Sequence, residues 1–214
     1  MSAKTVLILG GGLGGLTAAG HLRRMLAPEH HVLVVEKKET FSLCMANLWL
    51  MTGERTAPAE GERELSALAK RHIGWVHGTV EAMDPESRTV HTTAGTLSAD
   101  YVIVALGADK SPRAVPGFAE AALNLYDAGG AQEIQRKLAE FSGGRIVVLV
   151  ARTPFSCPSA PYEAAFLIEA LMRERGLRER TQIAVYTPED IPMLAAGPAV
   201  GTALVDMLSE RGIE

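Results

Sequence analysis

A run of glycines near the start of the chain constrains its fold more than any other feature. Residues 10–15 read Gly-Gly-Gly-Leu-Gly-Gly, and Gly10, Gly12 and Gly15 have the spacing GxGxxG. The residues just before them, Thr5–Leu9 (TVLIL), form a short apolar run typical of a strand buried on both faces. The pattern therefore predicts a strand that turns sharply at the glycines and enters a helix.

Each of the three glycines has a separate physical task in such a turn. Gly10 allows the tight turn out of the strand, and Gly12 has no Cβ, so that a pyrophosphate can approach the backbone. Gly15 lets the helix pack closely on the strand. The free N–H groups and the positive dipole end of the helix N-terminus then favour bound phosphate.

An acidic residue follows at the distance expected for a dinucleotide site. A helix is predicted at residues 14–25 and a second buried strand at residues 31–36 (HVLVVE), which ends at Glu36. This carboxylate is suited to accept hydrogen bonds from ribose hydroxyls, and it would repel a 2′-phosphate, which argues against NADP. The unit is predicted to bind the ADP half of FAD or NAD; the alternative is a structural turn followed by a surface glutamate. The predicted contacts also include Leu13, Gly14 and Lys37.

Composition excludes several other classes of function. The chain has 214 residues, 47% of them hydrophobic, and a formal charge of −4, which does not suit nucleic-acid binding. No signal peptide or membrane-spanning run is recognisable, so a cytoplasmic protein is expected. Two cysteines are too few for a disulfide framework, and the six histidines lack metal-type spacing, so no metal site is predicted.

The segment after Glu36 favours FAD over NAD. A plain NAD-binding domain would continue with strand–helix units, but here a short helix and three strand-like runs are expected, at residues 62–71, 75–83, 88–93 and 101–106. This order resembles that of the flavoproteins with two dinucleotide-binding folds, whose FAD domain carries an inserted β-meander. The resemblance implies an FAD domain of that kind.

The end of the last of these runs strengthens the resemblance. Ala105-Leu106-Gly107-Ala108 is similar to the ATG-type motif of those flavoproteins, where a strand end passes close to the flavin nucleotide; Leu106 replaces the usual threonine. A strand that ends in an ordinary glycine turn is the alternative. The FAD contacts implied here are Val80, Ala105 and Gly107.

Prolines after this strand mark a domain boundary. The predicted fold class is α/β: a Rossmann-like FAD-binding domain with an inserted β-meander at residues 1–113, then part of a second Rossmann-like domain at residues 114–214. Ile213 is expected to begin a further strand. The elements predicted in the second domain are a helix at 131–141, a strand at 145–150, a helix at 161–175, a strand at 182–186 and a helix at 199–211.

The turn after the first strand of the second domain contains a cysteine and no glycine. Residues 151–163 read ARTPFSCPSAPYE, so side chains and prolines fill the space that a pyrophosphate would need. The second domain is therefore not expected to bind NAD. Cys157 stands just before a predicted helix, and a helix N-terminus favours the thiolate, the form that attacks sulfur and flavin. The alternative is a buried structural thiol.

Residues 157–165 (CPSAPYEAA) resemble the cysteine segment of the sulfide:quinone oxidoreductases and flavocytochrome c sulfide dehydrogenases. The resemblance runs from the glycine motif to the end of the chain. It implies that Cys157 is a redox cysteine that pairs with a second cysteine, that sulfide or another small sulfur species is the substrate, and that FAD passes the electrons to a quinone or a cytochrome.

Cys44 lies in the segment that follows the second strand, where the chain is expected to turn toward the flavin ring. Flavocytochrome c sulfide dehydrogenases have a cysteine near this position that is joined covalently to the flavin. The resemblance therefore implies that Cys44 lies near FAD or forms a thioether with it. The neighbouring residues are mostly apolar, so an inert, packed thiol is the alternative.

Members of that family are roughly twice as long as this chain, so we expect a fragment or one of two chains. Their C-terminal half carries a Gly-Asp motif that contacts FAD, the second redox cysteine and the acceptor surface. Membrane association is expected only through such a part, and a homo-oligomer is possible. Two other functions stay open: an NADH:quinone-type flavin dehydrogenase, and a non-catalytic dinucleotide-binding module.

Overall fold

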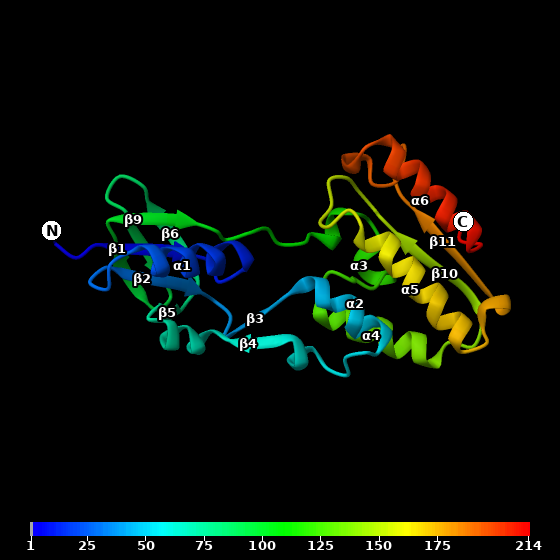
Figure 1. Cartoon of the computed structure of the whole chain (residues 1–214), viewed down its shortest axis with the longest axis horizontal. Helices are drawn as coiled ribbons and strands as arrows, with labels where there is room; N and C mark the ends of the chain where they lie inside the picture. The colour runs from blue at the N-terminus through cyan, green and yellow to red at the C-terminus, as the bar shows by residue number, and fades with distance from the viewer. Residues whose placement is uncertain (1) are drawn as a thin grey trace. The chain divides into compact units, whose positions relative to one another are not determined.

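The structure, a computed structural model, describes residues 2–214 as two compact units (Figure 1). Unit 1 comprises the residues up to Leu43 together with Gly61–Lys110, and unit 2 comprises Cys44–Glu60 and Ser111–Glu214. The chain passes from unit 1 to unit 2 for the last time after Lys110, three residues before the boundary predicted after residue 113. The segment 44–60, which the sequence-based division assigned to the first domain, packs with unit 2.

Unit 1 is built on a four-stranded sheet in the order β5-β2-β1-β9, in which all neighbours are parallel. An antiparallel meander, β6-β7-β8, and a small pair, β3-β4, accompany it. The predicted α/β class is confirmed. The elements of unit 1 are β1 (Thr5–Leu9), α1 (Leu13–Met25), β2 (His31–Glu36), β3 (Thr40–Ser42), β4 (Glu62–Glu64), the 3-10 helix η3 (Leu65–Arg71), β5 (Gly74–His77), β6 (Val80–Asp84), β7 (Thr89–Thr92), β8 (Gly95–Ser98) and β9 (Tyr101–Val104).

The continuous apolar run of β1 is explained by what covers the two faces of the sheet. Side chains alternate along a strand, so Ile8 points to one face and Leu7 and Leu9 to the other. Ile8 belongs to a buried cluster with Ala19 of α1, whereas Leu7 and Leu9 form a second cluster with Val90 of the meander. The helix and the meander therefore each cover one face, and both faces of β1 must be apolar.

Two predictions for the inserted segment are wrong in detail. The run 75–83 is two strands, because the chain leaves the parallel sheet after β5 and enters the meander at β6. Gly78 lies at the crossing, where an added Cβ would come within 3.1 Å of the Ala94 Cβ. The predicted helix 62–71 is instead strand β4 followed by η3, and strand β8 was not predicted at all.

Unit 2 contains a parallel pair of strands, β10 and β11, and α5 runs alongside both (Figure 1). Ile213 makes a parallel bridge with Ile183 of β11, as expected of a residue that begins a further strand. Among residues 2–214 there is no helix with the length and apolarity to cross a membrane. The α-helices and strands of unit 2 are α2 (Asn47–Thr52), α3 (Phe118–Ala121), α4 (Ala128–Glu140), β10 (Gly144–Leu149), α5 (Ala160–Glu174), β11 (Thr181–Tyr186) and α6 (Pro198–Glu210). Its 3-10 helices are η1 (Cys44–Ala46), η2 (Pro58–Gly61), η4 (Pro112–Ala114), η5 (Arg178–Arg180) and η6 (Leu194–Ala196).

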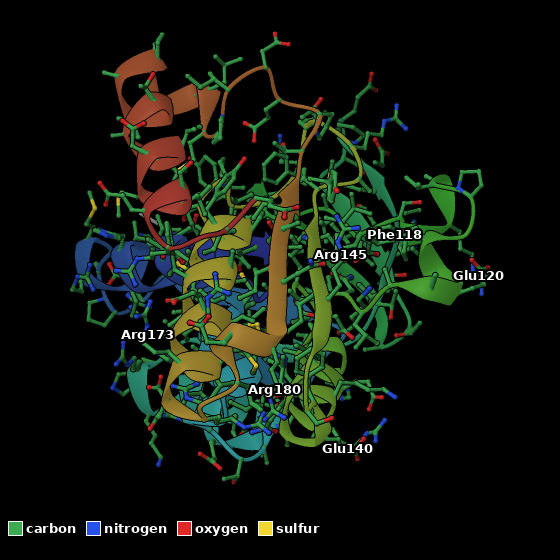
Figure 2. The ribbon with its side chains drawn as sticks, turned by 90° about the vertical axis from the view of Figure 1, so that its right-hand side faces the viewer. Phe118, Glu120, Glu140, Arg145, Arg173 and Arg180 are labelled. Carbon is green, nitrogen blue, oxygen red and sulfur yellow. The ribbon has the colours of Figure 1, made fainter. Side chains whose placement is uncertain are left out.

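A buried carboxylate ties α5 to the end of α6. The Glu169 side chain is fully buried and forms ion pairs with Arg173, with Arg178 (Nε to Oε1, 3.4 Å) and with Arg211 (Nη1 to Oε2, 3.4 Å). Arg173, labelled on α5 in Figure 2, keeps 64% of its side chain exposed, whereas Arg178 is 20% exposed. Arg178 also donates to the carbonyl oxygens of Arg211 (2.6 Å) and Gly212 (2.8 Å). The buried Glu169 carboxylate thus connects α5, the segment at Arg178 and the end of α6.

We predict that Glu169→Gln lowers the free energy of unfolding of unit 2 by about 2–3 kcal/mol, because the arginines lose a charged, buried hydrogen-bond acceptor. Denaturant unfolding followed by Trp49 fluorescence, in a Trp75→Phe background, measures the effect on unit 2. The matched control is Glu133→Gln, which removes an exposed pair with Arg136 and should cost no more than about 0.5 kcal/mol. Equal effects of the two substitutions would contradict the assignment.

Candidate functional site

Two glycines of the GxGxxG turn are required by packing. Gly10 adopts φ +108°, and a Cβ there would lie 2.3 Å from the Ala105 carbonyl oxygen. A Cβ on Gly15 would lie 1.9 Å from the Gly10 carbonyl oxygen. No side chain fits at either distance, so α1 and the end of β9 can approach the turn this closely only with glycine. The geometry agrees with the tasks that the sequence assigned to these residues.

The other two glycines of the predicted set face open space. An added Cβ on Gly12 or on Gly14 would have no heavy atom within 4 Å. Gly12 is also the N-cap of α1 and offers no side chain to its N–H groups. The turn therefore leaves a bare backbone cradle at a helix N-terminus, which is the arrangement that binds phosphate groups in proteins.

Glu36 is held beside this cradle. Its Oε2 accepts from the Gly11 backbone N–H (2.7 Å) and its Oε1 accepts from the Lys38 N–H (3.0 Å). A Cβ on Gly11 would come within 2.8 Å of the Glu36 Cβ, so this glycine too is needed for the approach. The end of β2 and the glycine turn thus meet, which puts a carboxylate next to the cradle as a ribose ligand requires.

Apart from Cys44, the remaining residues of the predicted cofactor set lie in unit 1. Leu13 begins α1 and is 62% exposed, and Lys37 is exposed, with its Nζ 4.0 Å from the Asp109 carboxylate. Ala105 donates its N–H to Leu9 (2.8 Å), and Gly107 adopts φ +72°. Val80 packs against the core cluster between sheet and meander. Their contacts with a cofactor stay predictions.

Cys157 lies in unit 2, in the loop between β10 and α5. It is a free, half-buried thiol, and its backbone has φ +50°, which is unusual for a residue with a Cβ. Its carbonyl oxygen accepts from the Ala160 N–H (3.1 Å), and its Sγ lies 3.7 Å from the Ser159 Oγ. The thiol thus stands just before the N-terminus of α5, as the sequence predicted.

Cys44 also lies in unit 2, where it begins η1 and is exposed. Tyr126 interacts electrostatically with both cysteines: burial first, and then the Cys157 and Cys44 thiols, raise the pKa of its hydroxyl to about 12. The Tyr126 hydroxyl donates to the Cys157 carbonyl oxygen (3.2 Å). Sequence reasoning missed Tyr126, because no motif marks it and only the fold brings it to the thiols.

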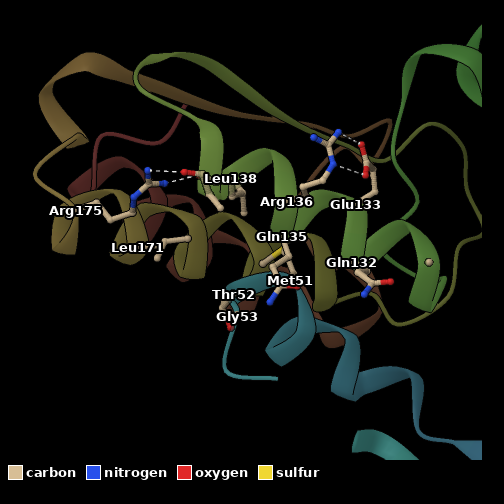
Figure 3. A pocket seen from close by; sticks show the side chains of 12 residues that line it. Met51, Thr52, Gly53, Gln132, Glu133, Gln135, Arg136, Leu138, Leu171 and Arg175 are labelled. Atoms are coloured by element: carbon tan, nitrogen blue, oxygen red, sulfur yellow. Dashed lines mark hydrogen bonds and ion pairs between the residues drawn. The ribbon is translucent and has the colours of Figure 1, made fainter. Parts of the chain in front are cut away.

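Unit 2 also has a cavity away from both cysteines. It measures about 770 Å³ and lies between the end of α2, α4 and α5 (Figure 3). Neither cysteine lines it. Its two arginines are engaged, Arg136 with Glu133 and Arg175 with the Leu138 carbonyl oxygen, as Figure 3 shows. The cavity and the cysteine-bearing loop are therefore separate features of unit 2.

We predict that Gly15→Ala lowers the stability of unit 1 by about 3 kcal/mol, because the new methyl group would overlap a backbone oxygen that cannot move away. Gly14→Ala is the matched control, in the same helical turn but facing open space. It should leave stability unchanged or raise it by up to about 1 kcal/mol. Urea unfolding followed by Trp75 fluorescence measures both, and equal losses would refute the packing argument.

We predict that unit 2 loses stability between about pH 10 and about pH 12. Burial raises the pKa of Tyr126 and of Tyr162 to about 12, and Tyr162 also donates to Glu189 (2.8 Å). A raised pKa means that the folded state favours the neutral phenol, so this contribution is complete below pH 10 and is lost as the pH approaches 12. Denaturant unfolding at several pH values measures it. The fall in the free energy of unfolding with rising pH should be smaller in the Tyr126→Phe, Tyr162→Phe double variant. An equal fall in that variant and in the parent would contradict the prediction.

Comparison with known proteins identifies the family. Residues 4–150 match the pyridine nucleotide-disulphide oxidoreductase family. Curated relatives include the sulfide-quinone reductase of Aquifex aeolicus, 28% identical over 99% of this chain and 50% of that protein. The mitochondrial sulfide:quinone oxidoreductase of Mus musculus is 26% identical over 97% of this chain and 47% of that protein. The chain spans about half the length of these relatives.

Solved structures agree. The sulfide:quinone oxidoreductase from Aquifex aeolicus superposes with a TM-score of 0.89 and 27% identity, over 99% of this chain and 50% of that one. The NAD-dependent persulfide reductase from A. fulgidus shares the fold, with a TM-score of 0.75 and 20% identity over 98% of this chain and 39% of that one. The resemblance drawn from the sequence is confirmed, and the chain belongs to the pyridine nucleotide-disulphide oxidoreductase family.

Proposed function

We propose that this chain is the FAD-binding and thiol-bearing part of an oxidoreductase that oxidises sulfide and passes the electrons to a quinone or a cytochrome. The observation that carries the proposal is the loop after β10. It presents the free thiol of Cys157, and no glycine-rich turn, in a chain that is similar over 99% of its length to a sulfide-quinone reductase.

The residues of unit 1 fit the ADP end of FAD. Gly12 and Gly14 leave room for a pyrophosphate against the N-terminus of α1, and Glu36 stands where ribose hydroxyls can donate to it. When bound, FAD would supply a two-electron acceptor. The other predicted contacts, from Leu13 and Lys37 to Val80, Ala105 and Gly107, belong to the same proposal.

Cys157 is the proposed nucleophile for sulfur. Joining its thiolate to a hydrosulfide ion forms one S–S bond and releases one proton and two electrons, so the reaction needs a two-electron acceptor. The Cys157 thiol is free, and the residue is partly exposed. Cys44 is proposed to lie near the flavin, with a thioether to FAD as the more specific form of that proposal.

A second candidate function is supported by one relative. The alternative NAD(P)H-ubiquinone oxidoreductase C1 of Arabidopsis thaliana is 26% identical over 80% of this chain and 37% of that protein. This candidate would need a nicotinamide site, and the turn after β10 has no glycine to admit a pyrophosphate. We therefore favour sulfide over NADH as the electron donor.

We predict that the oxidoreductase of which this chain is proposed to be a part, loaded with FAD and kept free of oxygen, loses its visible flavin absorbance when sulfide is added. Cys157→Ser should bind FAD equally well and keep its colour, because the nucleophile is gone. Ser156→Ala is the matched control, an exposed neighbour in the same loop, and should bleach like the parent.

Three outcomes would contradict this proposal. Bleaching of Cys157→Ser at the parent rate would remove Cys157 from the chemistry. Bleaching by NADH and not by sulfide would select the second candidate function. FAD binding with no redox response to either donor would favour a non-catalytic dinucleotide-binding module.

A separate measurement tests the thioether at Cys44. The thioether is supported if the flavin stays attached to the denatured parent polypeptide but is released from the denatured Cys44→Ser variant.

A further inference from the structure

A short turn at residues 124–127 lies between the two cysteine-bearing segments of unit 2. The Asn124 Oδ1 accepts from the Tyr126 N–H (3.1 Å), and Asp127 caps α4 by accepting from the Gly130 N–H (3.2 Å). A Cβ on Gly130 would lie 2.1 Å from the Asn124 carbonyl oxygen, so the first turn of α4 presses directly on this backbone. The turn is therefore fixed by its own Asn124–Tyr126 hydrogen bond and by the packed first turn of α4.

This turn is hydrogen-bonded to both cysteine-bearing segments. Asn47, which is buried and directly follows the 3-10 turn that begins at Cys44, donates its side-chain N–H to the Leu125 carbonyl oxygen (3.1 Å). On the other side, the Tyr126 hydroxyl donates to the Cys157 carbonyl oxygen (3.2 Å). Two segments more than 100 residues apart in sequence are thus attached to the same short turn.

The hydrogen bond from Tyr126 stabilises the Cys157 backbone, whose conformation is an unfavourable one. Cys157 has φ +50°, a left-handed conformation that is unfavourable for a residue with a Cβ. Its carbonyl oxygen accepts two hydrogen bonds that hold the conformation, from Tyr126 and from the Ala160 N–H. The same conformation sets the Cys157 Sγ 3.7 Å from the Ser159 Oγ, close enough for the hydroxyl to donate to sulfur.

We propose that Tyr126 is a positioning residue for the Cys157 thiol: its hydroxyl holds the Cys157 backbone in the left-handed conformation that presents Sγ to Ser159. The redox role of Cys157 rests on the proposed function above, whereas the positioning concerns the thiol itself. A tyrosine hydroxyl is protonated at neutral pH, so that of Tyr126 is able to donate there.

The test is the rate at which iodoacetamide alkylates each cysteine of the 214-residue chain, measured by peptide mass mapping across a range of pH. In Tyr126→Phe, Cys157 is free to leave the left-handed conformation, and its sulfur moves away from the Ser159 hydroxyl. We expect alkylation of Cys157 at neutral pH to slow about three- to tenfold, with its pH profile displaced to higher pH, as the loss of one hydrogen bond allows.

Three internal comparisons sharpen this experiment. Cys44 in the same molecule should react at an unchanged rate. Tyr186→Phe, which removes a tyrosine hydroxyl bonded to Arg145 on the β10-β11 pair, should leave both rates unchanged. Ser159→Ala should slow Cys157 like Tyr126→Phe, and the double variant should be no slower than either single variant, because both act through one contact.

The proposal is overturned if Tyr126→Phe leaves the Cys157 profile unchanged, if it slows both cysteines equally, or if its effect adds fully to that of Ser159→Ala. A denaturant midpoint matched to the parent excludes general unfolding as the cause of slower alkylation. The experiment uses neither flavin nor sulfide. The expected alkylation pattern without sulfide bleaching would therefore refute the proposed function alone, and the reverse result would refute the positioning role alone.

Discussion

The close contact between α1 and β1 is the constraint on which the rest of unit 1 depends. Gly15 approaches the Gly10 carbonyl oxygen so closely that no side chain fits between them. This contact orients α1 so that its uncapped N-terminus opens beside the turn, and it lets the Ala105 end of β9 and the Glu36 end of β2 meet there. Within one turn, Gly10 and Gly15 thus permit the helix packing, and Gly12 and Gly14 leave the open backbone at which we propose phosphate binding.

Polar contacts of buried side chains hold α5 in place within unit 2. Three arginines compensate the buried Glu169 carboxylate, which joins α5 to the end of α6. Tyr162, at the start of α5, donates to Glu189. These contacts fix both ends of α5, and the thiol loop precedes its N-terminus. A cysteine held in an unusual backbone conformation needs such a rigid frame, because strain persists only where the surroundings determine it.

Much of the fold could be predicted from local patterns. The strands and helices with strong periodicity, such as β1, β2 and α5, were expected within one or two residues of their observed bounds. The inserted segment was not, because an alternating run at 75–83 does not reveal that the chain changes sheets at Gly78. The four residues of β8 include a glycine and carry too little pattern to mark a strand.

The sequence by itself determined the dinucleotide cradle and the cysteine before α5, because both depend on residues that are neighbours along the chain. Only the tertiary structure decided that Cys44 packs in the same unit as Cys157, and that Asn47 and Tyr126 connect their segments through one turn. These contacts join residues 31 or more positions apart, and a single sequence records no such pairing. The physical reason is that local propensities act over a few residues, whereas long-range contacts depend on how the packed elements bring distant segments together.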